Sequence, residues 1–216
     1  MTRLVLASAS PRRRALIQLL GVSFAVATAD VDEESVTDPD PARNVVETAR
    51  LKAKAVAQAL AGAAIVIGAD TTVACDGEML NKPVDAADAT DMLRRLRGRT
   101  HQVHTGLALL ETATGRWVTD VATVDVPMRA YSEAEIARYV ASGDPLDKAG
   151  AYAIQHPEFR PVSALKGCYA GVVGLPLCHL VRSLRRLGVE LTGDIATACQ
   201  KETQYDCPIY QSVLEG

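Results

Sequence analysis

The strongest strand signal in the chain is the stretch AIVIGADTTVA at residues 64–74. It is apolar and rich in β-branched residues up to Ala69, which favours a strand buried on both faces. Asp70 follows at once, so we expect its carboxylate at the carboxyl end of that strand. Ligands of open α/β sheets bind at this edge. Because burial of an unpaired carboxylate is unfavourable, Asp70 either caps its own loop or serves a ligand, a metal or a water molecule.

Strand-like and helix-like runs alternate along the chain, which is typical of an α/β protein. Helical periodicity and capping residues predict helices over residues 11–20, 41–61, 86–97, 133–142 and 176–187. Strands are predicted over residues 4–7, 64–74, 101–111, 117–128 and 167–175. A further strand begins at Ser23 and runs into an acidic loop bounded by prolines. We expect the two strands between His101 and Met128 to form a long antiparallel pair.

The composition permits a substantial core and excludes several classes of protein. Of the 216 residues, 48% are hydrophobic, which suits one large domain or two closely joined lobes. A net charge of −3 argues against a nucleic-acid-binding surface. The longest apolar stretch, residues 61–69, is too short to cross a membrane. Residues 188–216 are less clearly patterned.

The five cysteines show no CxxC spacing, and their number is odd. No export signal is expected, because only residues 4–9 are apolar near the start and arginines follow directly. We therefore expect reduced thiols and a cytoplasmic protein.

A basic cluster opens the first predicted helix. Ser10 is a suitable N-cap and Pro11 a suitable first helical residue, and Arg12, Arg13 and Arg14 come next. Cations at this end oppose the helix dipole by roughly 0.3–1 kcal/mol each. Positive side chains where the backbone is already positive indicate an anion between them, and phosphate is the obvious candidate. The alternative is that these arginines point to solvent.

Three further charged residues have both a functional and a structural interpretation. Glu33, in the acidic loop, is either a ligand or a solvated acid. Lys52 borders the apolar face of the helix predicted over 41–61, where a lysine binds a ligand or extends its charge to solvent. Lys82 is held extended by Pro83 and points either into a site or to water.

Together these residues predict phosphate chemistry. A carboxylate at Asp70 among cations suits a metal-bound polyphosphate. The cations stabilise the negative charge of the phosphates, and the carboxylate can hold a divalent metal or orient a water molecule. No Walker A or GxGxxG motif is present. His101 and His104, three apart in one strand, face opposite sides and make a poor shared metal site. The residues by themselves lead to phosphate-ester or nucleotide chemistry and no further.

Seven stretches resemble the Maf family of nucleoside triphosphate pyrophosphatases, in family order. They are LASASPRR (6–13), ARLKAKAVA (49–57), VIGADTTV (66–73), GEMLNKP (77–83), MLRRLRGRTHQVHTG (92–106), DPLDKAGAYAIQ (144–155) and VVGLPL (172–177). The resemblance ends near Leu187. It therefore implies one domain of two lobes over residues 1–187, followed by a C-terminal tail, 188–216, of unknown role.

The resemblance implies an elongated α/β fold of the Maf/ITPase kind, with a mixed sheet, flanking helices and a deep cleft between two lobes. It also implies hydrolysis of a nucleoside triphosphate to the monophosphate and pyrophosphate with a divalent cation, Mg²⁺ or Mn²⁺. By position, Asp70 would be the general base, and Glu33 with Asp70 would hold the metal. The residues that would bind the phosphates are Ser8, Arg12, Arg13, Lys52 and Lys82.

Within the family, ADT (69–71) and AGAYAIQ (149–155) resemble the branch that acts on dTTP and UTP rather than on 7-methyl-GTP. Arg12, Thr71 and Gln155 would be its specificity residues, and a glutamine amide offers both a donor and an acceptor to a uracil or thymine edge. The implied role is house-cleaning, the removal of non-standard or excess pyrimidine nucleotides. Residues 156–166 depart from the family pattern, so we expect that side of the cleft to be reshaped.

Two alternatives stay open at this point. One is a nucleoside triphosphate pyrophosphatase of broad range, and the other is a nucleotide-binding regulator of cell division and septum formation. A pure binder needs the cations but not Asp70 and Glu33 together, which favours an enzyme. No nucleic-acid or membrane partner is expected, and a homodimer is compatible with the resemblance.

Overall fold

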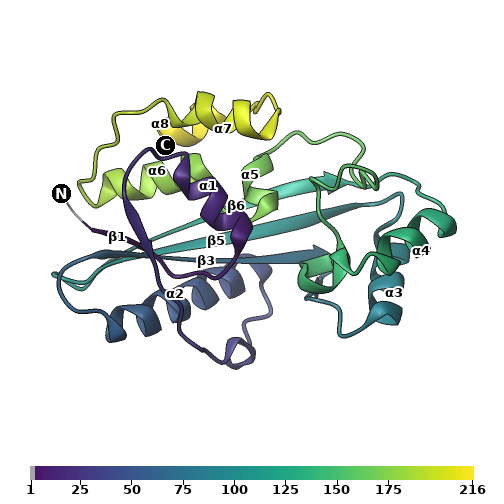
Figure 1. Ribbon diagram of the computed structural model, residues 1–216, viewed down its shortest axis with the longest axis horizontal. Helices are drawn as coiled ribbons and strands as arrows, with labels where there is room; N and C mark the ends of the chain where they lie inside the picture. Colours follow the sequence, from purple (N-terminus) through teal and green to yellow (C-terminus); the bar gives the residue numbers. More distant parts are fainter. Residues whose placement is uncertain (1–2) are drawn as a thin grey trace.

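The sheet is mixed, with strand order β2-β1-β3-β5-β6, and β4 pairs with the C-terminal end of β3 (Figure 1). The computed structural model describes residues 3–216. The strands are β1 (Leu4–Leu6), β2 (Phe24–Val26), β3 (Ile65–Cys75), β4 (Glu78–Leu80), β5 (Thr100–Glu111) and β6 (Arg116–Pro127). β1 is parallel to β2 and β3, whereas β3 pairs antiparallel with β4 and β5, and β5 with β6. The mixed, elongated α/β sheet confirms the predicted fold class.

Helices cover both faces of the sheet (Figure 1). They are α1 (Pro11–Gln18), α2 (Pro41–Ala59), α3 (Ala86–Leu96), α4 (Glu133–Ala141), α5 (Tyr169–Val173), α6 (Leu177–Arg186), α7 (Ile195–Thr203) and α8 (Tyr210–Glu215), with short 3-10 helices η1 (Glu33–Ser35), η2 (Asp144–Asp147) and η3 (Ala149–Ala151). α2 packs on one face and α5 and α6 on the other, while α3 and α4 pack together at one end. The long strands β3, β5 and β6 run along the long axis of the molecule (Figure 1).

Several helices begin where capping residues predict. The Ser10 hydroxyl accepts a hydrogen bond from the backbone of α1, and Asp85 does the same for α3. At α4, Ser132 and Glu135 form the expected capping box. Each cap satisfies backbone N–H groups that a helix start otherwise leaves without a partner.

α2 lies very close to the sheet because glycine stands beneath it in both β3 and β5. A Cβ atom on Gly68 would overlap the carbonyl oxygen of Ala49, and one on Gly106 would lie 2.6 Å from the backbone of Val45. No larger side chain fits at either position without moving the helix. This close contact brings Lys52, which follows Ala49 by about one turn, over the middle of β3.

β3 is longer than its two neighbours on one edge, which leaves a gap in the sheet. β1 pairs with residues 65–67 of β3 and β4 with residues 73–75. Between them, no strand of the described chain covers residues 68–72 on this edge. Asp70 and Thr71 lie in that gap. The prediction that Asp70 ends the strand is wrong, because β5 pairs with β3 as far as Ala74 and so extends it.

The segment 167–175 does not form the predicted strand. It forms α5, which begins where the Sγ atom of Cys168 accepts a hydrogen bond from the N–H of Gly171 at 3.2 Å. The carbonyl of Gly171 in turn accepts a hydrogen bond from the Thr105 hydroxyl of β5 at 2.8 Å. The apolar run is therefore buried against a face of the sheet rather than paired at its edge, two arrangements that a short apolar pattern does not distinguish.

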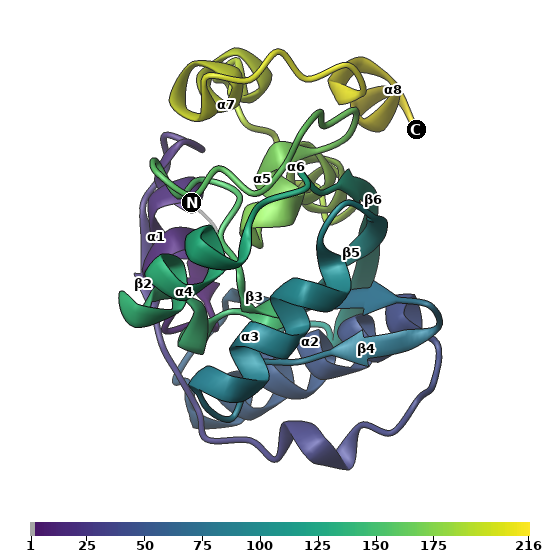
Figure 2. The same ribbon diagram turned by 90° about the vertical axis from the view of Figure 1, so that its right-hand side faces the viewer.

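Residues 188–216 fold into α7 and α8, which lie over α5 and α6 on the outside of the molecule (Figure 2). Cys178 of α6, Ala196 of α7 and Val213 of α8 form a small buried cluster between them. Across residues 3–216, no helix combines the length and the apolar character needed to cross a membrane.

Candidate active site

A cavity of about 1000 Å³ opens at the gap between β1 and β4. All nine predicted site residues line it: Ser8, Arg12, Arg13, Glu33, Lys52, Asp70, Thr71, Lys82 and Gln155. They come from segments far apart in the chain, and the sheet brings them together. Their individual roles stay predictions.

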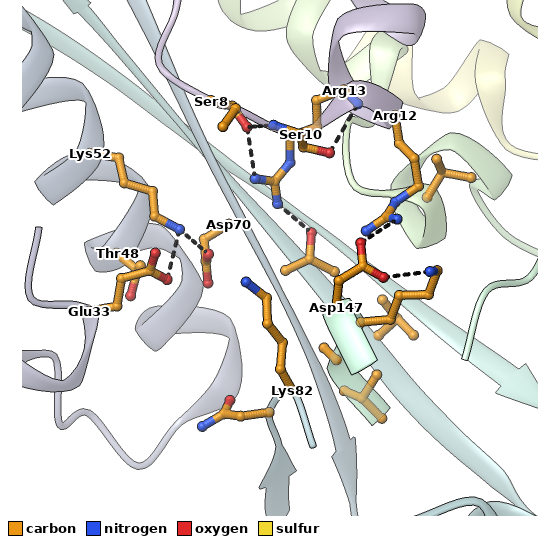
Figure 3. Close-up of a pocket in the computed structure, with 18 of the residues that line it drawn as sticks. Ser8, Ser10, Arg12, Arg13, Glu33, Thr48, Lys52, Asp70, Lys82 and Asp147 are labelled. Carbon is orange, nitrogen blue, oxygen red and sulfur yellow. Dashed lines mark hydrogen bonds and ion pairs between the residues drawn. The ribbon is translucent and has the colours of Figure 1, made fainter. Parts of the chain in front are cut away.

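One wall of the cavity holds three charged side chains in contact (Figure 3). The Lys52 Nζ atom donates a hydrogen bond to Asp70 Oδ1 at 2.6 Å and lies 2.8 Å from Glu33 Oε2. The side chains of Lys52 and Asp70 are each 16% exposed, whereas that of Glu33 is 53% exposed. One ammonium group therefore neutralises only one of two carboxylates, and this wall keeps a negative charge that faces the cavity.

The acidic loop that carries Glu33 is attached to the first turn of α2. The Asn44 amide donates hydrogen bonds to the carbonyl oxygens of Val36 and Asp38, both at 3.1 Å. Arg43 binds the Asp38 carboxylate at 2.9 Å, and its hydrogen bonds hold the pKa of Asp38 below the ordinary value. Sequence reasoning missed Asn44, because no local pattern shows which loop an asparagine amide will bind.

Arg13 lies at the opposite wall, at the start of α1. Its guanidinium donates to the Ser8 hydroxyl at 3.4 Å (Figure 3). It also donates to the Gly174 carbonyl at 2.8 Å and to the Thr71 hydroxyl at 3.0 Å. Burial lowers the pKa of Arg13, and the charge of Asp70 opposes this effect. Neutral acceptors thus fix the group without neutralising its charge, which leaves a preorganised cation for an anionic ligand.

Arg12 reaches across the cavity to η2. Its guanidinium lies 3.2 Å from the Asp147 carboxylate of η2, which also binds Lys148 at 2.6 Å (Figure 3). Burial alone would raise the pKa of Asp147, but the hydrogen bond and charge of Lys148, followed by Arg12, lower it. Both Asp147 and Lys148 line the cavity. Neither was assigned from the sequence, although both lie in the family-like stretch 144–155.

Lys82 and Gln155 complete the predicted set. Lys82 follows β4, and its side chain points into the cavity toward Asp70 (Figure 3). The preceding residue, Asn81, accepts a hydrogen bond from the N–H of Gly150 at 3.2 Å, which joins this segment to η3. Gln155 lines the cavity on the segment that follows η3.

The segment 156–166, which departs from the family pattern, does not line the cavity. It folds away from it, with the His156 ring accepting a hydrogen bond from the N–H of Phe159 at 2.9 Å. Phe159 stacks on Tyr139 of α4 with ring centroids 4.3 Å apart. The segment therefore packs against α4, and its effect on the shape of that side of the cleft stays a prediction.

Comparison with known proteins finds a matching family model and many relatives. The family model described as Maf-like protein matches residues 3–187. A protein named dTTP/UTP pyrophosphatase from Geotalea uraniireducens (strain Rf4) is 44% identical over 187 residues, which is 87% of this chain and 96% of that protein. A protein of the same name from Geobacter sulfurreducens (strain ATCC 51573 / DSM 12127 / PCA) is 46% identical over 186 residues, 86% of this chain and 97% of the relative.

Among solved structures, the Staphylococcus aureus Ham1 protein is similar to 60% of this chain and 73% of its own, with 17% identity and a TM-score of 0.45. That partial likeness adds nothing to the assignment. The family model spans most of the chain, and the relatives match along nearly their whole length. The chain therefore belongs to the Maf family.

Proposed function

We propose that the protein hydrolyses dTTP, UTP and modified pyrimidine nucleoside triphosphates to the monophosphate and pyrophosphate. Relatives named dTTP/UTP pyrophosphatase match this chain along almost their full length. The observation that carries the proposal is a single cavity in which the carboxylates of Asp70 and Glu33 face a group of cations. Those cations are Arg12, Arg13, Lys52 and Lys82.

The cations suit a triphosphate. Arg12 and Arg13 stand at the N-terminus of α1, where backbone N–H groups and the helix dipole also favour anions. Arg13 is already fixed by three protein acceptors, so it loses little freedom when a phosphate binds. Lys82 approaches from the other lobe, which allows the phosphate chain to be held from both sides.

Asp70 is assigned as the general base. Its Oδ1 atom accepts the hydrogen bond from Lys52, and its Oδ2 atom accepts none from residues 3–216, which leaves that atom for a water molecule. Asp70 would take a proton from this water as its oxygen attacks the α-phosphorus, and the bond to pyrophosphate would break. Such base catalysis contributes roughly 10²–10⁴-fold to a rate.

A divalent cation, Mg²⁺ or Mn²⁺, is part of the proposal. Glu33 and Asp70 converge on one point, because a single ammonium group lies within 2.8 Å of both carboxylates. Within residues 3–216 no three His, Cys, Asp or Glu side chains are grouped to hold a metal, so phosphate oxygens and water would complete the ligands. Mg²⁺ is commonly held in this way. When bound, the cation would offset phosphate charge and polarise the phosphoryl group.

We further propose that Gln155 reads the base edge. No side-chain hydrogen bond within the described chain occupies its amide, which leaves a donor and an acceptor for a pyrimidine. Thr71 shares its hydroxyl with Arg13 and Thr105, so its proposed effect on specificity is to position Arg13. We place the reaction in the cytoplasm, in keeping with five free thiols.

The test is pyrophosphate release from dTTP, UTP, CTP, GTP and 7-methyl-GTP with Mg²⁺ or Mn²⁺. We expect the highest kcat/KM for dTTP and UTP. Similar values for all five substrates would indicate a broad-range pyrophosphatase, and a preference for 7-methyl-GTP would overturn the branch assignment. Absence of turnover, with binding retained, would indicate a nucleotide-binding protein.

A further inference from the structure

Four of the five cysteines surround a second, much smaller cavity of about 20 Å³ between the tail and the domain. They are Cys168 before α5, Cys178 in α6, Cys199 in α7 and Cys207 between α7 and α8. The space suffices for about one water molecule. All four thiols are free, and none lines the active-site cavity.

Cys207 lies beside the peptide group that joins Gly167 to Cys168. The Cys207 Sγ atom lies 4.0 Å from the carbonyl oxygen of Gly167, the oxygen of the peptide group that Cys168 shares. The backbone N–H of Cys207 donates to the Gln200 side chain at 2.9 Å, which fixes the chain on its other side. Cys207 is half-buried, whereas Cys168 is buried.

Tyr205 anchors the same part of the tail. Its hydroxyl donates to the Leu165 carbonyl at 2.9 Å, and its ring lies 5.6 Å from that of Tyr169 between centroids. These contacts bind the tail on both sides of Cys168. Several neighbouring contacts therefore hold Cys207 beside the peptide group of Cys168, and its position does not depend on the sulfur atom alone.

We propose that Cys207 and Cys168 are an oxidisable pair that a peroxide closes to a disulfide, joining the tail to the domain. The Cys207 thiolate attacks the peroxide O–O bond and becomes a sulfenic acid, and the hydroxide released takes up a proton to form water. The Cys168 sulfur then attacks the Cys207 sulfur and displaces its hydroxyl group. That group leaves as a second water with the thiol proton of Cys168, so two thiols lose two electrons and the peroxide gains them.

The surroundings favour Cys207 as the first sulfur to react. Burial raises the pKa of Cys168, and it raises that of Cys199 to about 11, which keeps both as protonated thiols. The thiolate is the nucleophile, and peroxide reaches a half-buried sulfur more readily than a buried one. A thiolate metal centre is not favoured, because no metal-site grouping occurs in the part of the chain that the structure describes.

The expected consequence is a more stable attachment of the tail. A disulfide between Cys168 and Cys207 closes a long loop, and cross-links of this kind limit the freedom of the unfolded chain. The oxidised protein should melt several degrees above the reduced protein. This readout is independent of nucleotide hydrolysis, so it fails or succeeds separately from the proposed function.

The test oxidises the full-length protein with hydrogen peroxide, blocks residual thiols with an alkylating agent and maps tryptic peptides without reduction. The four cysteines around this cavity fall on three peptides: 167–182 with Cys168 and Cys178, 187–201 with Cys199, and 202–216 with Cys207. We expect 167–182 joined to 202–216, a product that dithiothreitol separates. The link should persist in Cys178→Ser and in the matched control Cys199→Ser, and the rise in melting temperature should disappear in Cys207→Ser.

Two results would overturn the proposal. One is a link between 187–201 and 202–216, which would make Cys199 the partner. The other is sulfinic acid at Cys207 with no cross-linked peptide, which would show that no thiol reaches the oxidised sulfur. Cys75→Ser serves as the control for a cysteine outside the cluster, because Cys75 lies in β3.

Discussion

Arg13 differs from its two neighbours although the sequence presents three arginines in a row. Its guanidinium is fixed by Gly174, Thr71 and Ser8, whereas Arg12 binds the Asp147 carboxylate of η2. Arg14 is exposed, and within residues 3–216 its side chain donates only to the Ala9 carbonyl, at 3.1 Å. The three arginines at this helix start therefore make three different sets of contacts. Of the three, Arg13 is the one that neutral acceptors hold in place at the cavity.

Arg13→Lys should lower kcat/KM for dTTP by about 10- to 100-fold, since a charged hydrogen bond contributes about 1.5–3 kcal/mol and lysine lacks the planar donor fork. Pyrophosphate release in steady-state assays measures the effect. Arg14→Lys is the matched control and should leave kcat/KM unchanged. A loss in Arg14→Lys with none in Arg13→Lys would show that the wrong arginine has been assigned.

Several charged residues of the site could be found from the sequence, but Asp147, Lys148 and the pairing of the charges could not. Ser10, Pro11 and the arginines form a local pattern, and Asp70 stands out beside an apolar run. The contact between Arg12 and Asp147 joins residues 135 positions apart, and no local pattern reports it. The position of Lys52 between two carboxylates likewise depends on how α2 packs, which a helical periodicity does not specify.

The active-site cavity exists because of the lengths of β1, β3 and β4. β3 extends past the end of β1 and reaches β4 only at residue 73, so the edge between them is open. α2 then places Lys52 at this opening through its close contact with Gly68. The geometry of the wall that holds Glu33, Lys52 and Asp70 thus depends on a glycine that carries no functional group.

Gly68→Ala should destabilise the protein by about 1–3 kcal/mol or more, because its Cβ would overlap the Ala49 carbonyl oxygen and force α2 outward. Urea unfolding measures the change. Gly193→Ala is the matched control, since a Cβ there meets only the flexible end of Ile195 at 3.3 Å. Equal stability of the two variants would contradict the close packing of α2.

His101, in β5, makes the unfolding free energy of the protein depend on pH. Its ring shares a hydrogen bond with the Tyr152 hydroxyl at 2.8 Å, and burial lowers its pKa from 6.5 to about 4. The unfolded chain therefore binds the proton more tightly than the folded protein. The stabilisation is complete above pH 6.5 and is lost as the pH falls toward 4, by up to about 3 kcal/mol.

His101→Gln should therefore show a shallower decline of unfolding free energy between pH 7 and pH 4 than the unsubstituted protein. Chemical unfolding at a series of pH values provides the measurement. His104 and His179, whose pKa values burial also lowers, retain part of the slope. Identical slopes for the two proteins would exclude His101 as a source of the pH dependence.

Most elements could be predicted, because capping residues and periodicity mark their ends. The helix starts at Ser10, Asp85 and Ser132 are local signals of this kind. The apolar run 167–175 was assigned wrongly, since a short apolar segment fits a strand and a buried helix equally well. Asp70 was placed at the strand end because the apolar run stops at Ala69, although the strand predicted over residues 64–74 continues past it, as β3 does.

At the scale of the whole molecule, the residues that line the active-site cavity all lie within the family match, residues 3–187, whereas α7 and α8 lie outside that match. No residue beyond 187 lines that cavity. The resemblance to the Maf family predicted the domain but gave no information on the tail, because the family match ends at the same residue. How α7 and α8 cover α6 is decided by long-range packing of Cys178, Ala196 and Val213.

A protein truncated after Leu187 should retain pyrophosphate release from dTTP while its melting temperature falls. Removal of the tail exposes the face of α6 that carries Cys178 and deprives Arg182 of the Val213 carbonyl. A loss of about 2–3 kcal/mol corresponds to a decrease of roughly 5–10 °C for a chain of this size. Calorimetry and steady-state assays measure both effects. A folded but inactive truncation would contradict the division into catalytic domain and tail.

The central claim is that Asp70 activates water in a cavity whose cations bind the triphosphate. The most direct test is Asp70→Asn, which keeps the size of the side chain and removes the base. We predict that kcat for pyrophosphate release from dTTP falls by at least about 100-fold, while calorimetry shows that dTTP binding is retained. Turnover close to that of the unsubstituted protein would contradict the assignment of Asp70 as the general base.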